Sequence, residues 1–176
     1  MGLFGRRAKK VTAGALWTRW FMPVVPEGHP SLETYESLIT DEERERLPKT
    51  LQKLALDGVD RIYDVRGKEV APDRNGLAYL EELLDAGLRM NLERDQDRGN
   101  PRNLFRIVAT EIGCIVGEVY RRTNKGRWVP RRGPNHWRSL IRSEAGTEFD
   151  PFRLVVRQMS DEREPGALLN HYDAFR

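Results

Sequence analysis

The chain has 176 residues, of which 30 are Lys or Arg and 27 are Asp or Glu, and its formal net charge is +3. This length supports one hydrophobic core, and no window approaches the ~18 uncharged apolar residues of a membrane-spanning helix. The single cysteine, Cys114, excludes an internal disulfide, and its apolar neighbours predict a small buried side chain in a reducing, cytoplasmic setting.

The N-terminal part is predicted to be a basic and aromatic arm with a proline-rich linker over residues 1–30, followed by a single domain over 31–176. Its first 20 positions carry five Lys or Arg and no acid. Arg19 interrupts the apolar run after these cations, which argues against a secretory signal. We expect a disordered or partner-docked arm, and the alternative is a membrane-surface anchor through residues 1–22. The aromatic side chains of that anchor would be Trp17, Trp20 and Phe21.

A helix is predicted from about Asp41, because Thr40 and Glu43 have the spacing of a capping box. Proline lacks the amide hydrogen that a helix interior needs, so Pro48 is expected to kink or divide this helix. Residues 61–65 alternate poorly and are interpreted as a strand or an extended lead-in.

Leucines then recur at three- and four-residue intervals from Leu77 to Leu92. This spacing predicts one amphipathic helix that faces the core. Asp73 or Asn75 is expected to cap its N-terminus, since both side chains accept hydrogen bonds from free helix amides.

A longer and more apolar helix is predicted from near Arg102 to the turn at 124–126, and it carries a line of small residues. Ala109, Gly113 and Gly117 are four apart and therefore stack along one side. Each helical glycine costs roughly 1 kcal/mol relative to alanine, so another element must approach closely there. We assign this ridge to packing against a sheet, since no phosphate-binding glycine pattern accompanies it.

Strands are predicted next, over residues 127–129, 137–142 and 147–149. The first two are rich in aromatic and β-branched residues and are separated by turn formers, which predicts an antiparallel pair. Asp150 before Pro151 has the signature of a helix start, and a last helix is expected from Pro165. The elements together predict an α+β fold, with helices packed on one face of a small antiparallel sheet.

Several of these motifs occur together in a known group. The sequences Gly113-x-x-x-Gly117-Glu-Val119, Gly126-Arg-Trp128 and Asp150-Pro-Phe152, followed by a helix ending near Tyr172, resemble small bacterial proteins grouped as domains of unknown function. The resemblance covers roughly residues 73–175. This chain departs from that pattern at Cys114-Ile115, where an aromatic-leucine pair is common. The resemblance implies an α+β fold and brings no catalytic residues to carry over.

Two residues, Glu118 and His136, are candidates for catalysis. A carboxylate on an apolar helix can be desolvated, and a raised pKa would suit it to acid or base catalysis. The alternative for Glu118 is an ion pair or hydrogen bond that ties its helix to Arg127 or Trp128. The histidines lack metal-ligand spacing, so no metal or other cofactor is predicted.

A basic window is the strongest sign of binding. Residues 119–143 hold eight Lys or Arg and no acid, and such a window attracts anionic partners. The alternative is a set of ordinary solvated arginines, because Arg outnumbers Lys 24 to 6 throughout the chain. The predicted contact residues are Arg127, Arg131, Arg132, Trp137 and Arg138.

The sequence therefore favours a non-catalytic, protein-binding accessory factor, of an immunity-like or regulatory kind, with an acidic protein as its partner. Three alternatives remain open. One is binding of single-stranded nucleic acid, with Trp128 and Trp137 as stacking platforms among arginines. The others are peripheral membrane association and an enzyme that uses Glu118.

Overall fold

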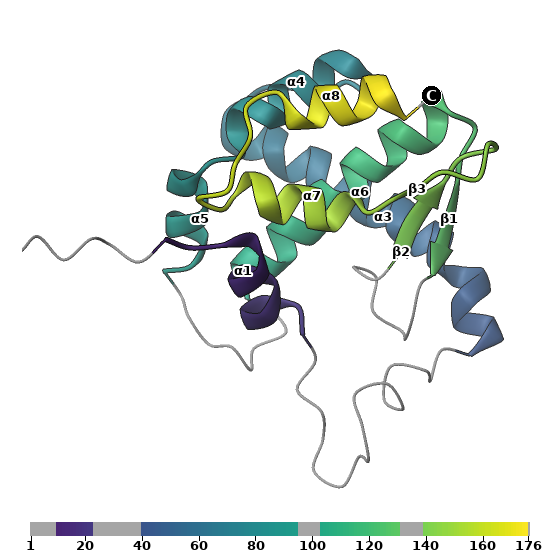
Figure 1. The fold of residues 1–176 in the computed structure, drawn as a ribbon, viewed down its shortest axis with the longest axis horizontal. Helices are drawn as coiled ribbons and strands as arrows, with labels where there is room; N and C mark the ends of the chain where they lie inside the picture. The colour runs from purple at the N-terminus through teal and green to yellow at the C-terminus, as the bar shows by residue number, and fades with distance from the viewer. Residues whose placement is uncertain (1–9, 23–39, 95–102, 131–138, 176) are drawn as a thin grey trace, which may run out of the picture.

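The computed structural model describes residues 10–22, 40–94, 103–130 and 139–175 (Figure 1). Its elements, in chain order, are α1 (Ala13–Trp20), α3 (Asp41–Arg66), α4 (Arg74–Leu83), α5 (Ala86–Leu92), α6 (Leu104–Thr123), β1 (Arg127–Pro130), β2 (Ser139–Arg142), β3 (Glu148–Phe149), α7 (Pro151–Gln158) and α8 (Ala167–Ala174). The strands lie at the end of the molecule away from α5. This arrangement confirms the predicted α+β fold.

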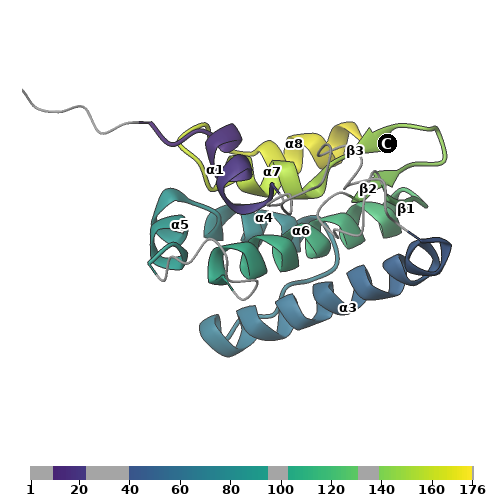
Figure 2. The same cartoon turned by 90° about the horizontal axis from the view of Figure 1, so that it is seen from below.

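Helix α6 is the centre of the core. Its main partners are α3 and α7, and Figure 2 shows α6 lying between α3 on one side and α7 on the other. Every α6 residue from Ala109 to Tyr120 is buried. The apolar helix predicted over this segment is therefore buried by other helices as well as by the sheet.

The first two strands form an antiparallel pair, as predicted, and β3 adds to it in the order β1-β2-β3. Residues opposite one another in such a sheet share a face, and neighbours along a strand alternate between faces. One row, formed by Trp128, Ile141 and Phe149, is buried in the core. The next row, formed by Arg127, Arg142 and Glu148, therefore lies on the opposite face.

Helix α3 runs for 26 residues without a break. Its N-terminus has the predicted capping box, with Glu43 N donating to Thr40 Oγ1 and Thr40 N donating to Glu43 Oε2. Pro48 lies inside the helix and does not divide it. The interpretation of residues 61–65 as a strand or lead-in is wrong, because contacts with α6 outweigh the weak local pattern. Arg61, for example, makes two hydrogen bonds to Glu111 of α6.

The leucine-rich segment forms two helices where one was predicted. Asp73 caps α4 as expected, but Leu84 takes an extended backbone conformation and ends this helix. The side chain of Asp85 then accepts a hydrogen bond from Leu88 N at 2.7 Å and begins α5. Leu84 stays fully buried, so the leucine spacing continues across the break without the helix continuing.

The described part of the N-terminal segment, residues 10–22, is a docked helix and its flanks. Val11 N donates to Asp161 Oδ2 at 2.6 Å, and Asp161 N donates back to Val11 O at 2.9 Å. The aromatic side chains assigned above to a membrane surface are instead buried in the core; they are Trp17, Trp20 and Phe21. The sequence predicted an arm that is disordered or docked on a partner. Residues 10–22 instead pack against the core of their own chain, because their apolar side chains are buried there.

Acid is expected to loosen this attachment. The hydrogen bond from Val11 N, with Arg89 nearby, lowers the pKa of Asp161. A lowered pKa in the folded state means that the stabilisation is present above the ordinary aspartate pKa of about 4 and is lost as the pH falls further. Protection of the Val11 amide in hydrogen-exchange NMR should decrease below about pH 4. Unchanged protection at that pH would show that the carboxylate does not hold this segment.

Candidate functional site

The small-residue ridge of α6 receives two aromatic rings. A Cβ atom added to Gly117 would lie 2.1 Å from the ring of Trp128, which comes from β1. A Cβ atom added to Gly113 would lie 2.4 Å from the ring of Phe152, which comes from α7. The predicted packing against the sheet is therefore correct at Gly117, whereas at Gly113 a helix takes that place.

Glu118, the first catalytic candidate, is a buried anchor between α6 and β1. Its carboxylate accepts two hydrogen bonds from Arg121, each at 2.9 Å, and one from Trp128 Nε1 at 2.8 Å. Arg122 Nε lies 3.5 Å from the same group. The hydrogen bonds to Glu118 raise the pKa of Arg121. Of the two partners predicted for a non-catalytic Glu118, Trp128 is confirmed. The charged partners are Arg121 and Arg122 of the same helix, where Arg127 was the alternative.

Glu111 has a similar role two turns earlier, on nearly the same face of α6. It is buried, and Arg61 of α3 contacts it through Nε at 2.7 Å and Nη2 at 3.0 Å. Both carboxylates on α6 are therefore engaged by guanidinium groups. Glu111 joins α6 to α3. Glu118 joins α6 to β1 and also binds Arg121 in the last turn of α6.

The predicted contact residues are only partly covered by the structure. Arg127 is exposed at the start of β1. The other four, together with His136, lie outside the described residues; they are Arg131, Arg132, Trp137 and Arg138. Trp128 is only 5% exposed, so it is not the open stacking platform that the nucleic-acid alternative requires.

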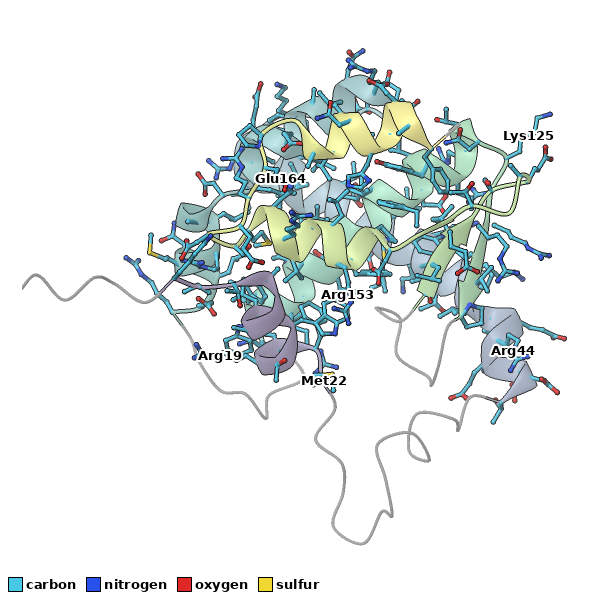
Figure 3. All side chains as sticks on the ribbon, in the orientation of Figure 1. Arg19, Met22, Arg44, Lys125, Arg153 and Glu164 are labelled. Atoms are coloured by element: carbon cyan, nitrogen blue, oxygen red, sulfur yellow. The ribbon has the colours of Figure 1, made fainter. Side chains whose placement is uncertain are left out.

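The face of the sheet that carries Arg127 is positively charged. Arg127 lies directly opposite Arg142 in the register of β1 and β2, and Arg142 forms an ion pair with Glu148 of β3. Like charges directly opposite in a sheet are destabilising. Within the described parts of the basic window, Lys125 and Arg127 make no ion pair, and Figure 3 shows Lys125 at the outer edge beside the strands. In this cross-strand row, two cations, Arg127 and Arg142, accompany one acidic side chain, Glu148.

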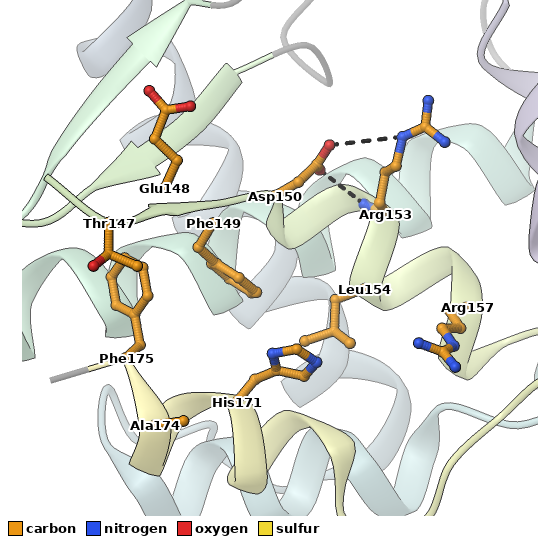
Figure 4. Close-up of a pocket in the computed structure, with 10 residues that line it drawn as sticks. All are labelled: Thr147, Glu148, Phe149, Asp150, Arg153, Leu154, Arg157, His171, Ala174 and Phe175. Atoms are coloured by element: carbon orange, nitrogen blue, oxygen red, sulfur yellow. Dashed lines mark hydrogen bonds and ion pairs between the residues drawn. The ribbon is translucent and has the colours of Figure 1, made fainter.

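A hollow of about 440 Å³ lies between β3, α7 and α8 (Figure 4). Phe149, Leu154 and Phe175 give it an apolar lining, and His171 faces Phe149 with ring centroids 6.2 Å apart. Most charged side chains at its rim form ion pairs, which are Arg142–Glu148, Arg153–Asp150 and Arg157–Glu164. The hollow thus offers apolar surface without a net charge, and no sequence motif marked it.

A second hollow, of about 270 Å³, lies between α3 and α6. Glu118 and Arg122 from α6 line it, and so does Leu56 from α3, whose side chain is 62% exposed. The remaining lining residues are Gln52, Ala55, Val59, Glu69, Val70, Pro72, Ile115 and Val119. This hollow brings a buried carboxylate, a cation and exposed apolar surface together.

Cys114 lies inside α6 and is fully buried, as predicted. Burial raises the pKa of its thiol, and the nearby carboxylates of Glu118 and Glu111 raise it further. Because the thiolate is the reactive form, the native protein should not react with Ellman's reagent at pH 8, whereas protein unfolded in guanidinium should release one equivalent. Rapid reaction in the native state would contradict this burial.

The comparisons with known proteins give no family and no function for this chain. A scan against family models and searches of curated proteins and solved structures found no match for this chain. Over the ranges that the structure describes, no helix is both long and apolar enough to cross a membrane, and no group of three metal-binding side chains occurs. The resemblance noted from the sequence therefore stays a prediction.

Proposed function

We propose that this chain is a non-catalytic accessory factor, of an immunity-like or regulatory kind, that binds an acidic protein. Its binding surface, which we call the hairpin surface, consists of Arg127, Arg131, Arg132, Trp137 and Arg138. We further propose a cytoplasmic location, which the single free cysteine supports.

The observation that carries this proposal is the cross-strand pair Arg127–Arg142. Two arginines directly opposite one another repel, and among the described residues Glu148 forms its ion pair with Arg142 and not with Arg127. A carboxylate from a partner, placed beside Arg127, would relieve this repulsion. The exposed Lys125 lies two residues away in the chain and adds to the attraction.

The direct test is charge reversal on the hairpin surface. The tagged protein captures its partner from a lysate of the native host, the partner is identified by mass spectrometry, and affinity is then measured with the purified pair. Arg127→Glu should weaken binding by about tenfold to a hundredfold, since losing a close charge pair at an interface costs about 1.5 kcal/mol or more. Arg131→Glu with Arg132→Glu should weaken it further.

The matched control is Arg94→Glu, which makes the same charge change at an exposed position just after α5, at the end of the molecule away from the strands. Its affinity should remain that of the unmodified chain. Equal affinity for all variants would reject the proposal. Capture of single-stranded oligonucleotide in preference to any protein, with steep salt dependence, would favour the nucleic-acid alternative.

A further inference from the structure

The hollow between α3 and α6 carries positive charge at one side of its mouth. Glu118 is a single carboxylate in contact with two guanidinium groups, those of Arg121 and Arg122. The cluster therefore has a net charge of about +1 at neutral pH. Arg121 holds Glu118 with two short hydrogen bonds, whereas Arg122 is 3.5 Å away and its side chain is 54% exposed. Arg122 can therefore bind a second carboxylate without releasing the first.

The same mouth carries apolar surface. Leu56 is 62% exposed, and the hollow beside it is lined by Ala55, Val70 and Ile115, which belong to the buried core. Burying apolar surface is favourable at roughly 25 cal/mol per Å². A hydrophobic side chain that enters here would cover Leu56 and reach the core.

The hollow also adjoins the strand end of the molecule. Helix α3 contacts β1, the strand that begins at Arg127. Arg122 occupies the last turn of α6, and Lys125 and Arg127 follow it within five residues. A partner held by Arg127 is therefore close to the mouth of this hollow.

We propose that the hollow between α3 and α6 receives an apolar side chain of the acidic partner, while Arg122 binds a carboxylate beside that side chain. This inference rests on the proposed function and adds the anchor that gives the charge attraction its specificity. The partner segment it fits is acidic and carries at least one large aliphatic or aromatic residue. Glu69 also lines the hollow and disfavours a carboxylate placed next to it.

The test uses two fluorescein-labelled peptides of 12 residues, composed of Glu and Ser, with either Phe or Ala at the centre. Fluorescence anisotropy measures their affinity for the full chain. The Phe peptide should bind about tenfold more tightly, the effect of burying one large apolar side chain. Leu56→Asn should bring the two affinities close together, and so should Val59→Phe, which fills the hollow.

Tyr63→Asn is the matched control, since Tyr63 is also an apolar residue of α3, is 57% exposed and does not line the hollow. This variant should still bind the Phe peptide about tenfold more tightly than the Ala peptide. Arg127→Glu should weaken both peptides equally and preserve the preference. Equal binding of the two peptides by the unmodified chain would overturn the anchor while leaving the charge-based function in place. Binding of neither peptide would count against both.

Discussion

Replacing Glu118 by alanine is expected to lower the free energy of unfolding by about 3 kcal/mol, because it removes two charge-assisted hydrogen bonds from Arg121 to a buried carboxylate. The substitution also leaves Trp128 Nε1 in a buried position without its acceptor. Urea denaturation followed by circular dichroism measures the change. A variant as stable as the unmodified chain would show that Glu118 is not a structural anchor.

Two comparisons make this result specific. Glu42→Ala removes a carboxylate whose pair with Arg46 is largely exposed, and it should change stability by less than about 0.5 kcal/mol. Glu118→Ala should also be less costly in a Trp128→Phe background, because that background no longer has the indole donor. Additive effects of the two substitutions would contradict the hydrogen bond between them.

Gly117→Ala is expected to destabilise the protein by about 2 kcal/mol, the usual range for overpacking a core being about 1–3 kcal/mol. The added methyl group would lie 2.1 Å from the Trp128 ring, which must move away from α6. Alanine favours helix by about 1 kcal/mol over glycine, so a loss of stability identifies packing as the cause. Thermal and urea unfolding both measure it.

Gly14→Ala in α1 is the control for helix propensity. No atom lies within 4 Å of a Cβ atom added there, so this substitution should stabilise the protein by up to about 1 kcal/mol. Opposite signs at the two glycines are the expected outcome. A stabilised Gly117→Ala variant would mean that Trp128 does not pack against the ridge.

Local signals in the sequence were enough to predict several elements. Three helix N-termini are capped by side chains that bond to an amide two or three residues ahead. Short sequence motifs are therefore enough to predict these caps, which are Thr40 with Glu43, Asp73 and Asp150. The antiparallel hairpin was also predictable, because aromatic and β-branched runs flank a turn.

Features that depend on distant contacts were not predictable in this way. Docking of α1 involves Asp161, which is 150 residues from Val11, and no local pattern indicates such a pair. Residues 61–65 likewise continue a helix that packs along α6, and Arg61 contacts Glu111, which is 50 residues away in the chain. The sequence did not indicate the break at Leu84, because the spacing of the leucines from Leu77 to Leu92 fits one helix as well as two.

The candidate site was predictable in part. The charge of the basic window is visible in the sequence. The sequence left Arg127 and Trp128 open as partners of Glu118, and the structure shows Trp128 together with Arg121 and Arg122. The register that sets Arg127 opposite Arg142 depends on the length and form of the turn, which composition does not give. The hollow beside Leu56 forms only when α3 and α6 pack together, so no segment alone could reveal it.

The most direct measurement of where this protein binds is chemical-shift mapping by NMR, with ¹⁵N-labelled chain titrated with the acidic Phe peptide. A binding surface at the strand end predicts shifts at Lys125, Arg127 and Arg142, together with Leu56 and Arg122 at the neighbouring hollow. Shifts confined to α4 and α8, with those five amides unchanged, would contradict it.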